Sequence, residues 1–111
     1  MVIHDCNPTR QEMAGPDFKA GGWCGVTYAA FIDFVLNRQD VSHYTVDCDY
    51  GCGVIFKRLT PTPFTMDPRL YFEWIATGGA MADRYTLFDR HRHKLLNLIS
   101  VETFLLLEAV P

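Results

Sequence analysis

The residues best suited to chemistry stand near the start of the chain, in the run His4-Asp5-Cys6-Asn7. These side chains can exchange or donate protons, and most are known metal ligands. They follow the apolar pair Val2–Ile3 and stop at Pro8, a pattern typical of the end of a short buried strand. The sequence therefore predicts a strand that delivers this polar cluster to the start of a loop.

A metal site is an alternative use of the cysteines. Cys48 and Cys52 are four positions apart, and Cys6 or His4 could complete a set of zinc ligands. The spacing differs from the two intervening residues that zinc knuckles prefer, so buried thiols on a hairpin are the competing interpretation.

The one dense basic stretch, Arg90 to Lys94, lies between apolar residues at helical spacing. Its two histidines, His91 and His93, are two positions apart and so point to different faces of a helix. We interpret the stretch as the solvent-exposed side of a helix, and not as a metal site.

The composition is that of one soluble globular domain. The 111 residues are 49% hydrophobic and 21% charged, which is enough apolar surface for a single core. Ten basic against thirteen acidic residues give a net charge of -3, which argues against nucleic acid as a partner. No apolar run is long enough to span a membrane and no secretory signal is visible, so we expect a cytoplasmic protein with reduced cysteines and no membrane partner.

Local patterns predict a loop, a helix and a hairpin in the first half of the chain. Glycine and proline breakers within Thr9–Gly22 indicate a loop long enough to cover a site. Apolar residues at three- and four-residue spacing predict a mostly buried helix over Val26–Asn37. Alternation over 43–48 and a β-prone run at 54–56 predict an antiparallel hairpin with its turn at Asp49–Gly53.

The second half reads as a stiff Thr-Pro connector at 60–63 followed by helices. Apolar periodicity predicts three helices, over Arg69–Ala76, about 83–98 and Val101–Ala109. Asp67 and Ser100 are expected to cap the first and the last of them, with Pro68 in the first helical position.

Four segments resemble, in the same order, segments of class I S-adenosylmethionine-dependent methyltransferases that act on small molecules. They are HDCNP, GGWCGVTYAAF, YTVDCDYGCGVIF and HKLLNLISVETFL. The resemblance implies a partial Rossmann-like α/β fold in which Val2–Ile3 ends the fifth strand of a seven-stranded sheet. The hairpin supplies the sixth and seventh strands, with flanking and C-terminal helices. The chain is then one partial domain, with sheet and helix in 1–59 and the connector and C-terminal helices in 60–111.

The part of that fold that binds the cofactor has no counterpart in this sequence. In the family the cofactor lies over a glycine-rich turn after the first strand and beside an acidic residue after the second. The glycine pairs of this chain have no preceding buried strand that feeds a helix. We therefore expect the chain alone not to bind S-adenosylmethionine.

The resemblance also implies roles for individual residues. Asp5 matches an acidic residue that, in metal-dependent members, holds a divalent cation such as Mg²⁺ against substrate hydroxyls. His4 is placed to accept the proton of the methyl acceptor. Asn7, Trp23 and Tyr28 are expected to bind the acceptor. From the residues alone, Asp5 and His4 are also explained as structural hydrogen-bonding groups of the following loop.

Two functional hypotheses follow. The first is the acceptor-side half of a methyltransferase, inactive alone and completed by an N-terminal half; its small-molecule acceptor is a sugar hydroxyl, an amine or a carboxylate. The second is a non-catalytic binding module derived from this fold. A strand without its neighbour exposes unpaired amides and carbonyls, so we expect a homodimer that pairs this edge.

Overall fold

The computed structural model describes residues 1–16, 23–38, 40–57 and 67–109. Within these residues the chain forms a four-stranded mixed sheet with helices, an α/β fold as predicted. The strand order is β1-β3-β2-β4, with β1 at Val2–Ile3, β2 at Val41–Val46, β3 at Cys52–Lys57 and β4 at Leu98–Ile99. β3 runs antiparallel to both β1 and β2, whereas β4 runs parallel to β2.

The predicted hairpin is confirmed, with bounds that differ from the expected ones. β2 and β3 pair in continuous register over six residues each. The turn between them covers 47–51, so Gly53, expected in the turn, lies within β3. A Cβ at Gly53 would lie 2.8 Å from Cys6 Sγ and 2.8 Å from a ring carbon of Phe31, which explains why glycine stands in this strand.

Val2–Ile3 forms a strand beside the hairpin, as predicted, but the strand is not buried. Among the described residues β1 pairs only with β3, and Val2 is 60% exposed. A strand at the edge of a sheet has a neighbour on one side only, and this position explains the exposure.

Three predicted helices are present with nearly the expected bounds: α1 (Thr27–Leu36), α2 (Pro68–Ala76) and α4 (Val101–Ala109). Both predicted caps are confirmed. The Asp67 carboxylate accepts a hydrogen bond of 2.9 Å from the N–H of Arg69 at the start of α2. Ser100 Oγ accepts one of 3.1 Å from the N–H of Thr103 at the start of α4.

The helix predicted over 83–98 has different ends. α3 (Met81–Leu96) begins two residues earlier and bends at His91, whose φ and ψ of -127° and 27° are non-helical. Asn97 takes a left-handed conformation, with φ 49°, and thereby ends the helix. Leu98 and Ile99, expected on the helix, leave it as β4 and pair with β2.

The predicted loop over 9–22 contains a short 3-10 helix, η1 (Gln11–Ala14), that the sequence patterns do not indicate. Met13 is buried, and its carbonyl accepts hydrogen bonds from the N–H groups of Cys24 and Gly25. This part of the loop therefore belongs to the body of the domain. Residues 17–22 and the connector at 60–63 lie outside the described residues.

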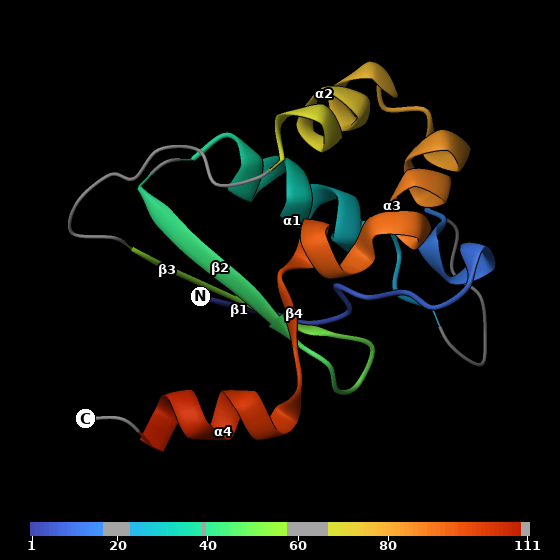
Figure 1. Cartoon of the computed structure of the whole chain (residues 1–111). Helices are drawn as coiled ribbons and strands as arrows, with labels where there is room; N and C mark the ends of the chain where they lie inside the picture. Colours follow the sequence, from blue (N-terminus) through green and yellow to red (C-terminus); the bar gives the residue numbers. More distant parts are fainter. Residues whose placement is uncertain (17–22, 39, 58–66, 110–111) are drawn as a thin grey trace.

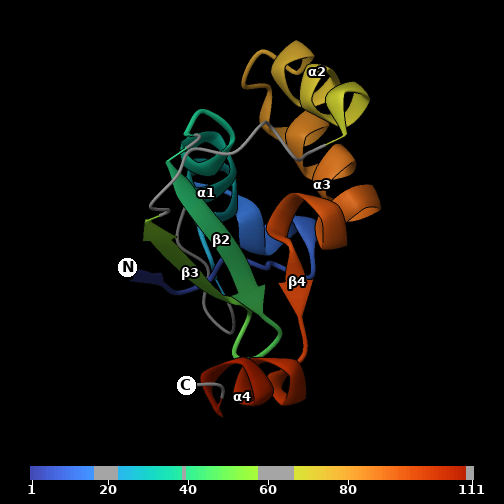
Figure 2. The ribbon, with the colours of Figure 1, turned by 60° about the vertical axis from the view of Figure 1, so that its left-hand side comes forward.

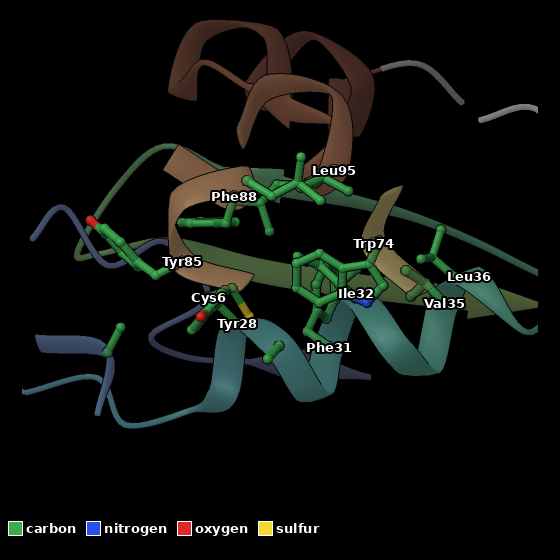
Figure 3. Close-up of a cluster of buried hydrophobic side chains, with 14 of the residues drawn as sticks. Cys6, Tyr28, Phe31, Ile32, Val35, Leu36, Trp74, Tyr85, Phe88 and Leu95 are labelled. Carbon is green, nitrogen blue, oxygen red and sulfur yellow. The ribbon is translucent and has the colours of Figure 1, made fainter. Parts of the chain in front are cut away.

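The main core lies between one face of the sheet and the helices α1, α2 and α3 (Figures 1 and 3). Its largest fully buried side chains include Trp74, Tyr28, Phe31 and Phe88. A polar contact joins the three helices: the carboxylate of Asp33 on α1 accepts hydrogen bonds from Trp74 Nε1 (2.8 Å) and from Arg84 (3.2 Å). The guanidinium of Arg84 also lies 4.9 Å from the ring centroid of Trp74.

α4 is set apart from the other helices and lies on the side of the sheet away from α1 (Figures 1 and 2). The alternation of side chains along β2 agrees with this placement. The centroid of the His43 ring lies 5.7 Å from that of Phe31 on α1, whereas the centroid of the Tyr44 ring lies 6.2 Å from that of Phe104 on α4. Despite its leucines, neither α4 nor any other described helix is long and apolar enough to cross a membrane.

Candidate functional site

The polar cluster predicted from the sequence forms a segment, His4–Pro8, that lies against the hairpin turn; we refer to it as the site segment. The N–H of Cys6 donates to the carbonyl of Gly51 at 3.1 Å, and the N–H of Asn7 donates to that of Tyr50 at 2.7 Å. The contact is close, because a Cβ on Gly51 would lie 2.6 Å from Asn7 Cβ. The turn between β2 and β3 thus holds the residues that follow β1.

Both sides of this contact contain left-handed backbone. Asp5 has a φ of 63°, and Asp49, Tyr50 and Gly51 have φ values of 45°, 60° and 89°. Such values are uncommon outside glycine, and they cost free energy in a bulky residue such as tyrosine. Residues in these conformations persist only where the surrounding contacts impose them, and they are concentrated at functional sites.

His4 and Asp5 are the proton-exchanging side chains of the site segment that solvent reaches. His4 is exposed and Asp5 is half-buried. Burial raises the pKa of the Cys24 thiol before α1, and the nearby Asp5 carboxylate raises it further. An imidazole and a carboxylate on adjacent residues at a strand end can accept a proton and orient a hydroxyl group.

Asn7, predicted to bind substrate, is engaged by the fold. It is 5% exposed, and its side-chain oxygen accepts a hydrogen bond of 2.6 Å from Arg92 Nη1. The same nitrogen donates to the carbonyl of Pro8 at 2.9 Å. The Arg92 guanidinium lies 4.8 Å from the ring centroid of Phe88 and also pairs with Asp89. Asn7 therefore anchors the site segment to α3.

Arg92 corrects the interpretation of the basic stretch as wholly solvent-exposed. Its side chain is only 16% exposed, whereas Arg90 is an exposed residue. One signal in the sequence points to this difference: Arg92 stands four residues after Phe88, and side chains at that spacing share a helix face. Its bonds to Asn7 and Pro8 join residues far apart in the chain, so no local pattern indicates them.

We expect an Arg92→Ala variant to lose about 2–3 kcal/mol of unfolding free energy, because the Asn7 and Pro8 oxygens lose a charged donor. Arg92→Lys should lose less, since an ammonium group keeps the charge but not the planar fork. Urea denaturation gives the free energies, and hydrogen exchange at the Asn7 N–H reports the site segment. Arg90→Ala is the matched control and should change stability by less than about 0.5 kcal/mol. Equal effects at the two positions would contradict the anchoring role.

The two aromatic residues predicted to bind the acceptor lie in different surroundings. Trp23 is 38% exposed, and its indole N–H donates to the carbonyl of Gly15 at 2.9 Å. Tyr28 is 2% exposed, and its ring contacts those of Trp74 and Phe88 in the core (Figure 3). Trp23 thus keeps a surface that a ligand can reach. The structure places Tyr28 on the core face of α1, where an acceptor does not reach it.

The four cysteines are free thiols and do not assemble the zinc site considered above. Cys6 and Cys24 are buried, Cys52 is half-buried and Cys48 is exposed. Among the described residues, no three His, Cys, Asp or Glu side chains are placed to hold a metal ion together. Within the described residues, Cys48 and Cys52 therefore do not form a zinc site with Cys6 or His4.

We expect the buried thiol of Cys6 to lower the unfolding free energy of the protein at alkaline pH. Burial of this fully enclosed thiol raises its pKa from 9.0 to about 12. Below pH 9 the thiol is protonated in both the folded and unfolded states, so it adds no pH dependence. Between pH 9 and 12 the unfolded chain releases the proton and the folded chain keeps it, so the unfolding free energy falls as pH rises, by about 1.4 kcal/mol per unit.

The measurement is urea denaturation at pH 8 and pH 10 in the presence of a reductant, for the wild type and for Cys6→Ala. We expect the wild type to lose more stability over this interval than the variant does. Burial also raises the pKa of Tyr28 to about 12, but that residue is present in both proteins and its contribution cancels. The same loss in both proteins would show that the thiol does not titrate in this way.

A cleft of about 270 Å³ lies between α2 and α3. Its walls carry both charges and come from Asp67, Arg69, Leu70, Glu73, His91 and Lys94. None of these residues belongs to the site segment, so the cleft does not extend the candidate site. The sequence gives no sign of it, because its walls form only when two separate helices pack.

The chain is thus an α/β fold in which the site segment follows the edge strand β1. Comparison with protein-family models, curated proteins and solved structures gave no match. The methyltransferase resemblance therefore rests on the four quoted segments, and the fold stands as an α/β sheet whose polar segment follows β1.

Proposed function

We propose that the chain is the acceptor-side half of an S-adenosylmethionine-dependent methyltransferase for a small molecule. One observation carries the proposal: Val2–Ile3 forms a strand beside the hairpin, and His4 and Asp5 directly follow its carboxyl end. Open α/β sheets bind their ligands at that end of their strands. The four segments of family resemblance gave the same expectation for this strand.

The open side of β1 supports a complementing half. Within the described ranges β1 is hydrogen-bonded on one side only, to β3. A strand edge of this kind is a template for another strand. A half that adds strands beside β1 would bring its own strand ends next to the site segment. The cofactor would then be held by the added half and the acceptor by His4 and Asp5.

The cofactor cradle would come from the complementing half. No glycine-rich turn among the described residues joins a strand to the helix that follows it, which is the arrangement that binds phosphate and sugar groups in such folds. This chain contributes only acceptor-side chemistry. The exposed His4 imidazole accepts the proton of the acceptor, and the Asp5 carboxylate orients the acceptor group by hydrogen bonding.

The test is calorimetric titration with S-adenosylmethionine. The chain alone should give no binding heat, whereas the chain combined with a glycine-rich strand-turn-helix segment encoded directly upstream should bind with a micromolar Kd. Micromolar binding by the chain alone would refute the missing-half part of the proposal. Failure of the combination to bind, or an upstream region without such a segment, would refute the proposal as a whole.

Activity of the combination is measured as S-adenosylhomocysteine released with small hydroxyl, amine and carboxylate acceptors. His4→Ala should lower the rate by about 10²–10⁴-fold, the usual range for a general base, without changing cofactor affinity. Asp47→Asn, on the exposed side of the hairpin turn, is the matched control and should keep full activity.

A second candidate, a non-catalytic module that self-associates, is favoured by the same unpaired edge of β1. It differs in one measurable respect: the module needs no complementing half and should be dimeric alone. Light scattering of Leu106→Glu at micromolar concentration tests it, because a dimer that pairs the edge of β1 does not depend on the side chains of α4. A well-folded monomer contradicts edge pairing with a second copy.

A further inference from the structure

The side of the sheet away from α1 carries an apolar surface that no described helix covers fully. Side chains of Val2, Tyr44 and Val54 stand in register across three strands, because Val54 pairs with both of the others. Phe56, two residues further along β3, points to the same face and is 48% exposed. The opposite face of these strands packs on α1, so this sheet is apolar on both faces, as in sheets that are covered on both sides.

α4 lies against this surface and is itself apolar on more than one side. The ring of Phe104 packs against the ring of Tyr44, with their centroids 6.2 Å apart. Leu106 stands two residues later, which turns its side chain by about 200° to the far side of the helix. Leu105, Leu106 and Leu107 are 59%, 70% and 52% exposed. Apolar side chains on several sides of a helix favour burial, and one sheet face can cover only one of those sides.

We define the outer patch as the apolar residues of this sheet face and of α4: Val2, Tyr44, Val54, Phe56, Val101, Phe104, Leu105, Leu106 and Leu107. We propose that the outer patch is the interface of a homodimer, in which the side of α4 that carries Leu106 packs in each copy on the uncovered sheet face of the other. This surface is separate from the hydrogen-bonding edge of β1, and the inference does not depend on the methyltransferase proposal.

Three observations favour a second copy as the occupant. The chain exposes both halves of the contact, a helix side and a sheet face, so a two-fold pairing covers both halves in both copies. Six side chains of the patch are 40% to 70% exposed, an area of several hundred Å², which approaches the roughly 800 Å² per partner of a standard stable interface. The sequence of α4 has two charged residues among nine, Glu102 and Glu108, so most of the helix surface is uncharged.

A lipid surface suits α4 less well. Interfacial helices bind anionic lipid through lysine and arginine on their polar face, and the sequence of α4 contains neither residue. Binding to lipid vesicles is measured below as the competing result.

The experiment compares the wild type with Leu106→Glu by light scattering over a micromolar concentration series. We expect a dimer for the wild type and a dissociation constant at least roughly 100-fold higher for the variant, because two buried leucines are lost per dimer. Phe72→Glu is the matched control: Phe72 is 67% exposed on α2, outside the outer patch, and its replacement should leave the dimer intact. Circular dichroism verifies that each variant is folded. We expect both to fold, because Leu106 and Phe72 are exposed.

Three results would contradict the homodimer. A wild type that stays monomeric over the series would overturn the proposal, and so would a Leu106→Glu variant that dimerises as tightly as the wild type. Co-sedimentation of a monomeric wild type with phosphatidylserine vesicles, lost in Leu106→Glu, would assign the outer patch to a lipid surface and likewise overturn it. Each result leaves the cofactor titration unaffected, so this inference and the proposed function fail separately.

Discussion

A Trp74→Ala variant is expected to lose about 3–5 kcal/mol of unfolding free energy, the range for removal of a fully buried aromatic side chain. Trp74 is 0% exposed, and its indole packs against the ring of Tyr28. The substitution removes this packing and also the N–H that donates to Asp33 at 2.8 Å. Domains of this size have a total stability of only about 5–15 kcal/mol, so this loss is a large fraction of the total.

Urea denaturation followed by far-ultraviolet circular dichroism measures the effect without depending on the tryptophan that is removed. Phe72→Ala is the control on the same helix, and its loss should stay within about 0.5 kcal/mol because Phe72 is 67% exposed. Trp74→Phe keeps an aromatic ring but not the donor, so it should lie between the two. A Trp74→Ala variant as stable as the control would mean that α2 does not contribute to the core.

A Gly51→Ala variant should show the second large effect, about 3 kcal/mol, and should displace the site segment. Gly51 has a φ of 89°, a conformation that costs an alanine about 1–2 kcal/mol. Its new Cβ would also lie 2.6 Å from Asn7 Cβ and 2.7 Å from Asn7 N. Relief of this overlap must stretch the hydrogen bonds from Cys6 and Asn7 to the turn, each worth about 1 kcal/mol.

Gly79→Ala isolates the cost of the backbone conformation alone. Gly79 has a similar φ of 84°, but a Cβ there would have no atom within 4 Å. The difference between the two variants in urea denaturation therefore measures the contact between the turn and the site segment. Hydrogen exchange should show faster exchange at the Cys6 and Asn7 amides in Gly51→Ala only. Unchanged exchange at both amides would refute the close contact.

The sequence predicts most of the elements whose signals are local. Asp67-Pro68 and Ser100 mark helix starts by their own hydrogen-bonding chemistry, and the structure confirms both. The hairpin follows from alternation around a glycine-containing turn. The apolar pattern places the end of α3 too late, because Leu98 and Ile99 continue that pattern and only their pairing with β2 makes them a strand. Parallel pairing between distant segments leaves no local trace.

Local patterns likewise predict some features of the candidate site and miss those that depend on tertiary contacts. The position of His4 and Asp5 after a strand follows from the change from apolar to polar residues, and the structure agrees. The anchoring of Asn7 by Arg92 joins residues 85 positions apart and could not be predicted. Tyr28 was expected to bind an acceptor, but the helical spacing that places it beside Phe31 and Ile32 also turns it into the core. Tertiary contacts, and not residue type, decide which of these side chains a ligand can meet.

The late position of α3 and β4 in the chain has a consequence for biosynthesis. Leu95 and Leu96 are 0% exposed, and β4 closes the sheet against β2. The apolar faces of α1 and the hairpin therefore stay open on the ribosome until these residues leave the exit tunnel. At about 5–20 residues per second this exposure lasts several seconds, during which the exposed apolar surface makes the nascent chain prone to aggregation.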